Sequence, residues 1–336
     1  MHRIILRFFG IPALFACFSV AMAASVTPKY FIQYMHNKHH FDPTELTLVL
    51  NSAVYQPQII TSMEKPYEKK TWNSYKRIFL TPQRLEEGLK FWQNNAVSLN
   101  QAEKRYNVPA SIIVAILGVE TLYGKKQGDY RVLDSLTTLA FHYPKRSAFF
   151  TKELEEYLLL CREQGLSPTY YTGSYAGAIG QPQFMPSSYR YYAATLSGAA
   201  KKDLVHDTPA VIASVANYLH KHGWQLNQGI TQAAIIHDQN ALRYININHH
   251  QATYPLKHLT QLGIQPLTAA LHQPHKAGVI ALTTKKGQEY WLTYPNFYVI
   301  TRYNTSPQYA MVVYLLSNQL QRHWAFMHQT KHYQYS

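Results

Sequence analysis

The sequence predicts an α+β fold that is predominantly α-helical. Two observations carry this prediction: helix starts of the cap-and-proline type recur along the chain, and strand-like runs gather in its last hundred residues. With 336 residues, 46% hydrophobic and 15% charged, the chain can bury one large core or two modest ones. The sequence has no internal repeat and no low-complexity linker, so we expect closely packed lobes rather than separable modules.

Helices are predicted where caps, prolines and apolar periodicity coincide. An N-terminal arm from Thr27 to about Gln58 is expected to be helical, because Phe31, Met35 and His39 recur at a helical interval and Asp42-Pro43 opens a second helix. Asp134 is expected to cap a helix over 135–141. Further helices are predicted over residues 81–97, 88–106, 108–124, 147–164, just after Met185-Pro186, over 208–223 and over 310–321.

A small antiparallel sheet is predicted near the C-terminus. Residues 278–284 and 289–294 form apolar runs separated by Lys285-Lys286-Gly287, a pattern typical of a hairpin. The turn Pro295-Asn296 is expected to lead into a third strand over 297–301. This sheet would sit between helices.

The first 23 residues have the features of a secretory signal. Basic residues near the start precede an apolar run, and Ala21-Met22-Ala23 has the small-x-small form of a cleavage site. The apolar run is too short for a stable membrane span. We therefore expect an exported, periplasmic protein with a mature chain over 24–336. The alternative is an outer-membrane lipoprotein, with membrane contact only if Cys17 is lipidated, although Phe15 is bulky for such a cleavage site.

The cysteines and histidines predict neither a disulfide nor a metal site. Without the signal segment only Cys161 remains, on an apolar stripe that indicates a packed, inert thiol. The pairs His39-His40 and His249-His250 have no third ligand at a regular offset, and adjacent residues do not share a helix face. We expect no metal and no cofactor.

The chain is strongly basic. Lys and Arg number 32 against 18 Asp and Glu, so the formal net charge is +14. In an exported protein this favours an anionic partner such as peptidoglycan, lipopolysaccharide or phospholipid head groups. Nucleic acid is not expected, because the sequence has no zinc spacing, no RNA-binding signature and no basic helix.

Glu120 is the candidate catalytic acid. It lies near the end of the helix predicted from Pro109 to Gly124, and counting back four and seven residues reaches Ile116 and Ile113. Desolvation beside these aliphatic side chains would raise the pKa of the carboxyl group and let it act as a general acid near neutral pH. The alternative is that Glu120 merely ends the helix and reaches water, because acids are electrostatically disfavoured at helix C-termini.

Several long motifs in order resemble the lytic murein transglycosylase B family. They are residues 118–128, 133–141, Tyr143-Pro144, 173–189, 214–218 with Gly223-Trp224, 296–304 and 309–311. The similarity runs from about Tyr30 to the C-terminus. It implies a lysozyme-like catalytic core over about residues 98–225, flanked by a helical lobe and a small β-sheet lobe.

The resemblance also implies the reaction: cleavage, without water, of the β-1,4 bond between N-acetylmuramic acid and N-acetylglucosamine in peptidoglycan glycan strands. Glu120 would protonate the glycosidic oxygen and then, as a base, take the proton of the muramoyl C6 hydroxyl, so that a 1,6-anhydro ring closes. The substrate's own N-acetyl group would replace the second carboxylate that glycosidases use. Asp129 and Asp134 are the nearby acids, and Asp134 is more simply explained as a helix cap.

The resemblance assigns substrate-binding roles as well. Ser174 and Gln183 would bond sugar N-acetyl and hydroxyl groups, and Asn304 would lie close to the acid. Pyranose C–H faces pack on aromatic rings, so aromatic residues would line the groove. These are Tyr75, Phe184, Tyr218, Tyr303 and Tyr309. For each tyrosine, the alternative is an ordinary core residue among the 27 tyrosines of the chain.

The sequence departs from the family over residues 195–207, where members can form an EF-hand-like metal loop. Alternating acids are missing, Ala200 replaces the turn glycine, and Lys201 and Lys202 add repulsion, so no bound calcium is predicted.

Two rival functions stay open: a non-catalytic peptidoglycan-binding scaffold, and a hydrolytic muramidase in which water attacks. A monomer is expected.

Overall fold

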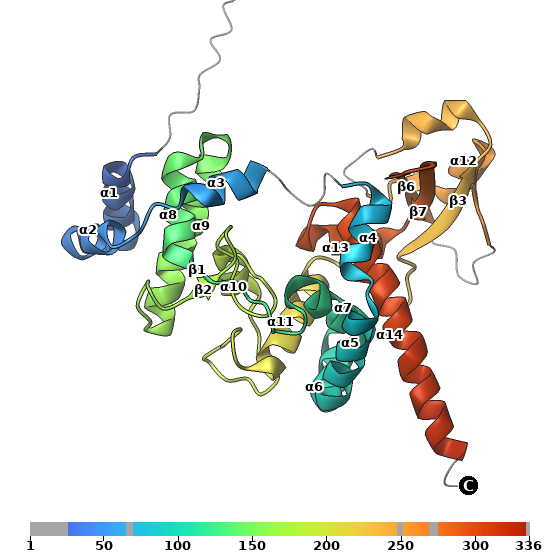
Figure 1. Ribbon diagram of the computed structural model, residues 1–336, viewed down its shortest axis with the longest axis horizontal. Helices are drawn as coiled ribbons and strands as arrows, with labels where there is room; N and C mark the ends of the chain where they lie inside the picture. The colour runs from blue at the N-terminus through green and yellow to red at the C-terminus, as the bar shows by residue number, and fades with distance from the viewer. Residues whose placement is uncertain (1–25, 65–69, 247–250, 269–274, 334–336) are drawn as a thin grey trace, which may run out of the picture.

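We describe the protein from a computed structural model over residues 26–64, 70–246, 251–268 and 275–333. The predicted signal segment with Cys17 and the pair His249-His250 lie outside the described residues. Figure 1 shows an elongated molecule, with α1, α2, α8 and α9 toward one end and the larger sheet toward the other. The fold is mostly helical α+β, as predicted.

The N-terminal arm is helical, as predicted. It consists of α1 (Pro28–His39), α2 (Pro43–Asn51) and α3 (Pro57–Glu64), and the side chains of Thr27 and Asp42 cap the first two helices. Phe31 and Met35 are buried on one face of α1. α3 packs on α8 (Val132–His142), which packs in turn along α9 (Ser147–Gln164).

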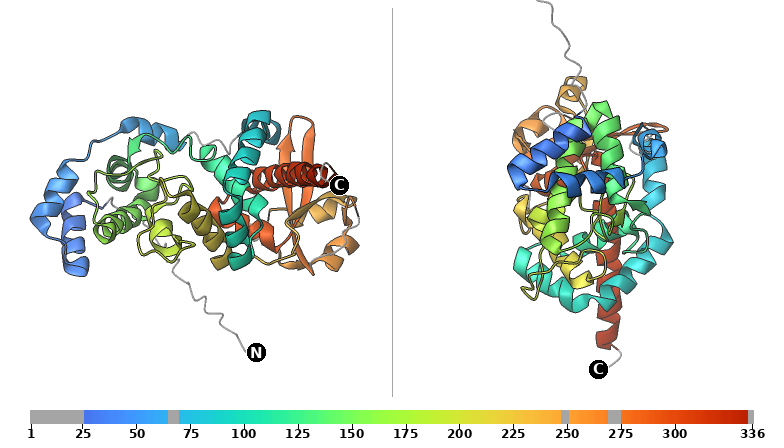
Figure 2. Two further views of the ribbon diagram at one scale, coloured as in Figure 1. Left: turned by 90° about the horizontal axis from the view of Figure 1, so that it is seen from below. Right: turned by 90° about the vertical axis from the view of Figure 1, so that its left-hand side faces the viewer.

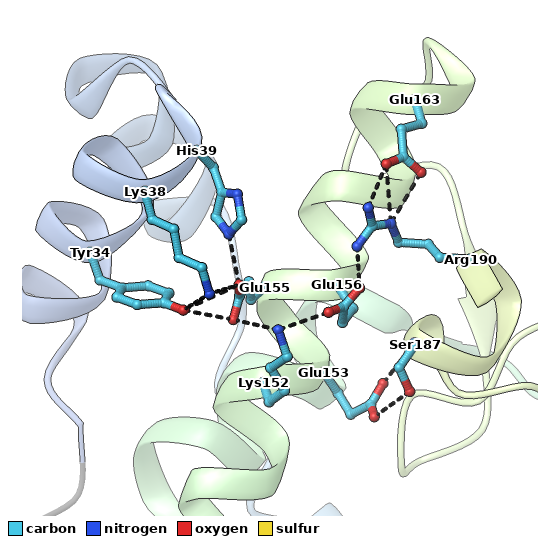
Figure 3. Close-up of polar contacts among 10 residues, drawn as sticks. All are labelled: Tyr34, Lys38, His39, Lys152, Glu153, Glu155, Glu156, Glu163, Ser187 and Arg190. Carbon is cyan, nitrogen blue, oxygen red and sulfur yellow. Dashed lines mark hydrogen bonds and ion pairs between the residues drawn. The ribbon is translucent and has the colours of Figure 1, made fainter.

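Buried glutamates of α9 tie neighbouring elements to this helix (Figure 3). Glu155 is 3% exposed and bonds His39 Nε2 of α1 at 2.7 Å, with Lys38 Nζ and Lys152 Nζ each at 3.1 Å. A salt bridge this close to the core requires several partners, because the desolvation of a lone carboxylate is costly. Glu155 therefore fixes the arm to the body of the protein.

A second set of contacts holds α10 (Pro186–Tyr192) against α9 (Figure 3). Glu153 accepts hydrogen bonds from the backbone nitrogen of Ser187 at 2.9 Å and from its hydroxyl at 2.7 Å, which satisfies the first turn of α10. Arg190 of α10 pairs with both Glu156 and Glu163 of α9.

The centre of the molecule is built around α7 (Ala110–Thr121). It packs against α5 (Pro82–Asn94), α6 (Ala96–Tyr106), α11 (Thr208–Lys221) and α14 (Pro307–Tyr333). Every residue of α7 is buried except Glu120, which is partly exposed. A helix that is apolar all round is stable only when neighbours cover every face. Figure 2 shows α14 running past this group of helices to the C-terminal end of the chain.

Two antiparallel sheets in the described part of the chain complete the fold. The larger one has the order β4-β6-β7-β3-β5, and the smaller one pairs β1 with β2. Their bounds are Tyr130–Arg131 (β1), Thr172–Gly173 (β2), Thr231–Ile236 (β3), Tyr254–Pro255 (β4), Ile264–Pro266 (β5), Lys276–Thr284 (β6) and Gly287–Thr293 (β7). α12 (Leu256–Gln261) packs against this sheet, and Trp72 Nε1 of α4 (Trp72–Phe79) bonds Glu289 of β7 at 3.1 Å.

The predicted hairpin is confirmed as β6 and β7, but the predicted third strand is wrong. Residues 297–301 belong to the helix α13 (Pro295–Tyr303), with proline at its first position. Burial of Phe297 and Ile300 on one helical face outweighs the strand preference of this β-branched and aromatic run. The strand beside β7 is instead β3, which pairs with it from Thr231↔Thr293 to Ala234↔Tyr290.

Two further predictions need correction. Asp134 is not an N-cap: it lies inside the first turn of α8, where its Oδ1 accepts from Val54 N at 3.0 Å and pairs with Arg131 at 3.0 Å. α7 ends at Thr121 rather than at Gly124, because Leu122 already has the left-handed conformation. Within the described ranges, no helix combines the length and hydropathy needed to cross a membrane.

Candidate active site

Glu120 lies in the last turn of α7, where the chain reverses direction. Leu122, Tyr123 and Gly124 have φ values of 50°, 60° and 83°, a left-handed run that is unusual outside glycine. Backbone bonds hold the reversal, from Leu122 N to Gly118 O at 3.3 Å and from Tyr123 N to Leu117 O at 3.0 Å. The abrupt end leaves the Glu120 side chain at the boundary of the buried core.

Tyr309, in the first turn of α14, orients the acid. Its hydroxyl donates to Glu120 Oε1 at 2.6 Å, and its side chain is 2% exposed. Burial, followed by the negative charge of Glu120, raises the pKa of Tyr309 well above its ordinary value. The phenol therefore keeps its proton and remains a donor to the carboxyl group.

Two more tyrosines continue from Tyr309, and we call Tyr218, Tyr303 and Tyr309 the tyrosine row. The rings of Tyr303 and Tyr309 are nearly parallel, with centroids 6.4 Å apart, and Tyr218 meets Tyr303 edge-on at 4.9 Å. Burial raises the pKa of Tyr218 and of Tyr303, and the charge of Glu120 acts in the same direction on both phenols. Three helices, α11, α13 and α14, thus bring the row to the acid.

The hydroxyl groups of Tyr303 and Tyr218 make hydrogen bonds within the protein. Tyr303 donates to Pro182 O at 2.6 Å, and Tyr218 donates to Arg302 O at 2.5 Å. Phe184 packs under both rings, with centroid distances of 5.5 Å to Tyr218 and 5.8 Å to Tyr303. Both hydroxyl protons are therefore committed within the protein; the ring of Tyr303 is partly exposed, whereas Tyr218 is 7% exposed and stacks on His222 at 4.1 Å.

The loop between β2 and α10 supplies Ser174 and Gln183. Ser174 Oγ accepts from Ala178 N at 3.0 Å, so the hydroxyl oxygen shapes the turn and its hydrogen can be donated outward. Gln183 has a φ of 51°, and its amide nitrogen donates to Gln127 O and to Gly180 O, each at 2.9 Å. The amide of Gln183 can therefore offer its oxygen, not its protons, to a ligand.

The other predicted site residues differ in exposure. Tyr75 on α4 is 1% exposed and Phe184 is 2% exposed, so neither presents an open ring face in this conformation. Tyr75 is near enough to Tyr309 to influence its titration. Asn304 directly follows α13, and its Oδ1 accepts from Ser306 N at 3.0 Å, which turns the chain toward Tyr309. Sugar contact by these residues stays a prediction.

Sequence reasoning missed Thr121, which links α7 to the loop between β2 and α10. Its buried hydroxyl donates to Gln181 O at 2.8 Å and accepts from Gly124 N at 3.0 Å. Gly124 itself packs so closely on Gln181 that an added Cβ would lie 2.9 Å from the amide carbon. The signal available in the sequence was a hydroxyl residue directly after the acid.

The segment 195–207 does not fit a calcium loop. Of its two acids, Asp203 accepts from Val205 N at 2.8 Å and from His206 N at 3.1 Å, and Asp207 caps α11 through Ala210 N. Both carboxylates are thus committed to backbone nitrogens, whereas calcium requires six or more oxygen ligands. That this chain binds no calcium stays a prediction.

Comparisons with known proteins identify the class of enzyme. Residues 26–318 match the family described as the transglycosylase SLT domain. The membrane-bound lytic murein transglycosylase B of Escherichia coli K12 is 38% identical over 296 residues, which are 85% of this chain and 80% of that protein.

Solved structures agree with the family match. Soluble lytic transglycosylase SltB1 from Pseudomonas aeruginosa is 40% identical with a TM-score of 0.81, covering 89% of this chain and 99% of that one. Escherichia coli Slt35 in complex with bulgecin A is 38% identical (TM-score 0.79; 88% and 92% covered). SltB3 from Pseudomonas aeruginosa in complex with NAG-NAM-pentapeptide is 26% identical (TM-score 0.75; 88% and 78% covered).

Fold, site and relatives together define a lytic transglycosylase, an enzyme that acts on peptidoglycan. The chain belongs to the transglycosylase SLT-domain family, in the lytic transglycosylase B group that its motifs predicted, and it has the lysozyme-like fold of Slt35.

Proposed function

We propose that the chain cleaves the β-1,4 bond between N-acetylmuramic acid and N-acetylglucosamine without water, with Glu120 as the single acid and base. The hydrogen bond from Tyr309 to Glu120 Oε1 at 2.6 Å is the observation that carries this proposal. A carboxyl oxygen that accepts a bond from a permanently protonated phenol is disfavoured as the site of the acidic proton. The transferable proton is therefore assigned to Oε2.

The reaction needs only Glu120, Tyr309 and the substrate. Glu120 Oε2 gives its proton to the glycosidic oxygen as the bond from that oxygen to muramoyl C1 breaks, and the substrate's N-acetyl group stabilises the cation at C1. The Glu120 carboxylate then removes the C6 hydroxyl proton while O6 attacks C1, which closes the 1,6-anhydro ring. The acid ends in its starting state, and no atom is gained from solvent. Tyr309 helps most when Glu120 is negative, because charge-assisted hydrogen bonds are the stronger ones.

Two nearby acids are poor candidates for a second catalytic carboxylate. Asp134 is buried in contacts with Val54 N and Arg131, and Asp129 is exposed. This supports the mechanism with one acid and substrate assistance over one with two carboxylates.

The glycan strand would lie along the tyrosine row. The partly exposed ring of Tyr303 would pack against sugar C–H groups, and Tyr218, 7% exposed and stacked on His222, would contribute the small part of its ring that is accessible. Phe184 packs against both rings and keeps them in place. Ser174 would donate a proton and Gln183 would accept one at the N-acetyl and hydroxyl groups. Asn304 would offer its amide protons, since its oxygen is bonded to Ser306. Tyr75 would support Tyr309 from behind.

The test is mass spectrometry of murein sacculi digested by the wild-type chain and by Glu120→Gln. We expect anhydro ends from the wild type and a loss of at least about 100-fold in turnover from the variant, the usual contribution of a general acid, with murein binding retained. Glu86→Gln is the matched control, because its side chain is 69% exposed on α5.

Other outcomes of the murein digestion would support one of the rival functions. Reducing ends in place of anhydro ends would identify a hydrolytic muramidase, and murein binding without fragments would identify a scaffold. Equal turnover in Glu120→Gln would remove this residue from its role. We also infer export of a monomeric mature chain, which the mass of its N-terminus and its sedimentation would check.

A further inference from the structure

Arg84, which no sequence motif singled out, joins the ends of two helices beside the acid. It lies in the first turn of α5, and its Nε donates to Gly118 O at 2.8 Å, two residues before Glu120. One terminal nitrogen of the same guanidinium donates to Ile78 O at 2.7 Å and to Phe79 O at 2.8 Å. A single planar cation thus bonds the last carbonyls of α4 and a carbonyl of the last turn of α7.

Carbonyls at a helix C-terminus lack partners within the helix and carry partial negative charge. Arg84 supplies such donors to Ile78 O and Phe79 O at the end of α4. Gly118 O, which already accepts from Leu122 N, gains a second donor, and the guanidinium places a positive charge at the negative ends of both helices. It is partly buried, and burial lowers the pKa of the guanidinium. Its contacts must offset that desolvation, and the Phe79 ring, 5.3 Å from Cζ, adds a cation–π contact.

Tyr123, on the C-terminal side of Glu120, makes a second contact with Arg84. Three residues after Glu120, its hydroxyl donates to Arg84 O at 2.8 Å, and its ring stacks on Phe91 at 5.5 Å. The ring occupies a gap between α5 and α7 that exists because Gly88 and Gly118 lack side chains: a Cβ there would lie 2.3 Å and 2.5 Å from the Tyr123 hydroxyl.

We propose that Arg84 is a positioning residue that fixes the Glu120 carboxyl group toward Tyr309. The guanidinium of Arg84 bonds the backbone before the acid, at Gly118 O, and the main-chain oxygen of Arg84 accepts from the Tyr123 hydroxyl after it. α4, bonded to the same guanidinium, carries Tyr75, which lies near Tyr309. Arg84 therefore links α7, which carries Glu120, to α4, whose Tyr75 lies near Tyr309. The inference rests on the proposed function for its kinetic part only.

The test compares Arg84→Met and Arg84→Lys with the wild type, using soluble peptidoglycan strands and release of anhydro ends. For Arg84→Met we expect kcat to fall about 10- to 100-fold with KM within about twofold, because a small misplacement of a catalytic group costs rate rather than binding. Arg84→Lys keeps the charge and part of the bonding, so it should recover part of kcat. Arg77→Met, an exposed arginine of α4, is the matched control and should match the wild type.

A second measurement does not depend on activity. Hydrogen exchange of the amides over Gly118–Gly124 should be faster in Arg84→Met than in the wild type. Tyr123→Phe removes only the hydroxyl that bonds the main-chain oxygen of residue 84 and should lower kcat a few-fold. Arg84→Lys keeps the test of the guanidinium decisive if Arg84→Met does not fold.

Unchanged kcat in a folded Arg84→Met, or a raised KM with unchanged kcat, would overturn the inference. So would unchanged exchange over Gly118–Gly124, or wild-type kcat in both Arg84→Lys and Tyr123→Phe. A wild type that yields no anhydro ends would instead refute the proposed function, and the exchange measurement would then decide on Arg84 alone.

Discussion

The Tyr309 hydroxyl and the Glu120 carboxyl group are 189 positions apart in sequence and 2.6 Å apart in space. The first turn of α14 and the last turn of α7 meet at this bond, with the two helices packed along each other. The acid is therefore oriented by the C-terminal helix of the chain, and its geometry depends on the whole fold being assembled.

Removing that bond should slow the reaction without weakening binding. In Tyr309→Phe the ring remains but the donor to Glu120 Oε1 is lost. Hydrogen bonds to charged groups contribute about 1.5–3 kcal/mol, so we expect kcat to fall about 10- to 100-fold with little change in KM. Steady-state release of anhydro ends measures this, and Tyr30→Phe, at a 65% exposed tyrosine of α1, is the control. Equal kcat in Tyr309→Phe and the wild type would contradict the role of the bond.

Thr121 should matter for stability through its two hydrogen bonds. Thr121→Val keeps the volume but leaves Gln181 O and Gly124 N without their partner in a buried place, so we expect a loss of about 1–3 kcal/mol in the free energy of unfolding. Thr121→Ser retains the hydroxyl and should lose less. Chemical denaturation followed by circular dichroism measures both variants, and a Val variant as stable as the Ser variant would show that the hydroxyl is unimportant.

The N-terminal arm should contribute stability that depends on pH. Burial alone would raise the pKa of Glu155, but hydrogen bonds from His39, Lys152 and Lys38 lower it to about 2. A depressed carboxyl pKa stabilises the fold above the ordinary value of 4.5, and this contribution is lost as the pH falls toward 2.

Glu155→Gln should therefore be less stable than the wild type at pH 7, and the gap should narrow as the pH drops from 4.5 to 2. Denaturation curves over this range measure the gap, with Glu86→Gln as an exposed control. A gap that stays constant down to pH 2 would mean that the carboxylate contributes nothing through its charge.

The sequence predicted helix starts where a capping side chain is followed directly by proline. Thr27, Asp42 and Thr81, each followed by proline, cap helices through their own side chains, so these starts could be read directly. Residues 297–301 misled the prediction, because their strand preference is weaker than the burial of Phe297 against the core. Tertiary packing of this kind has no local signature.

In the candidate site, too, residues within one segment were predictable and contacts between distant segments were not. Glu120 was predictable because an acid in an apolar helix is conspicuous within one segment. Its bond to Tyr309, the guanidinium of Arg84 at Gly118 O and the link from Thr121 to Gln181 join distant segments, and no spacing rule encodes them. The left-handed Leu122 also escaped prediction, since glycine is the usual residue there.

The burial of every residue of α7 except Glu120 limits how the sequence of this enzyme can vary. Each residue of an α-helix turns the chain by about 100°, so inserting or deleting one residue before Glu120 would swing the acid away from Tyr309 and rotate every side chain behind it into a wrong neighbour. Homologous enzymes with other substrate preferences should therefore keep the length of this helix and diversify in the loops that face it.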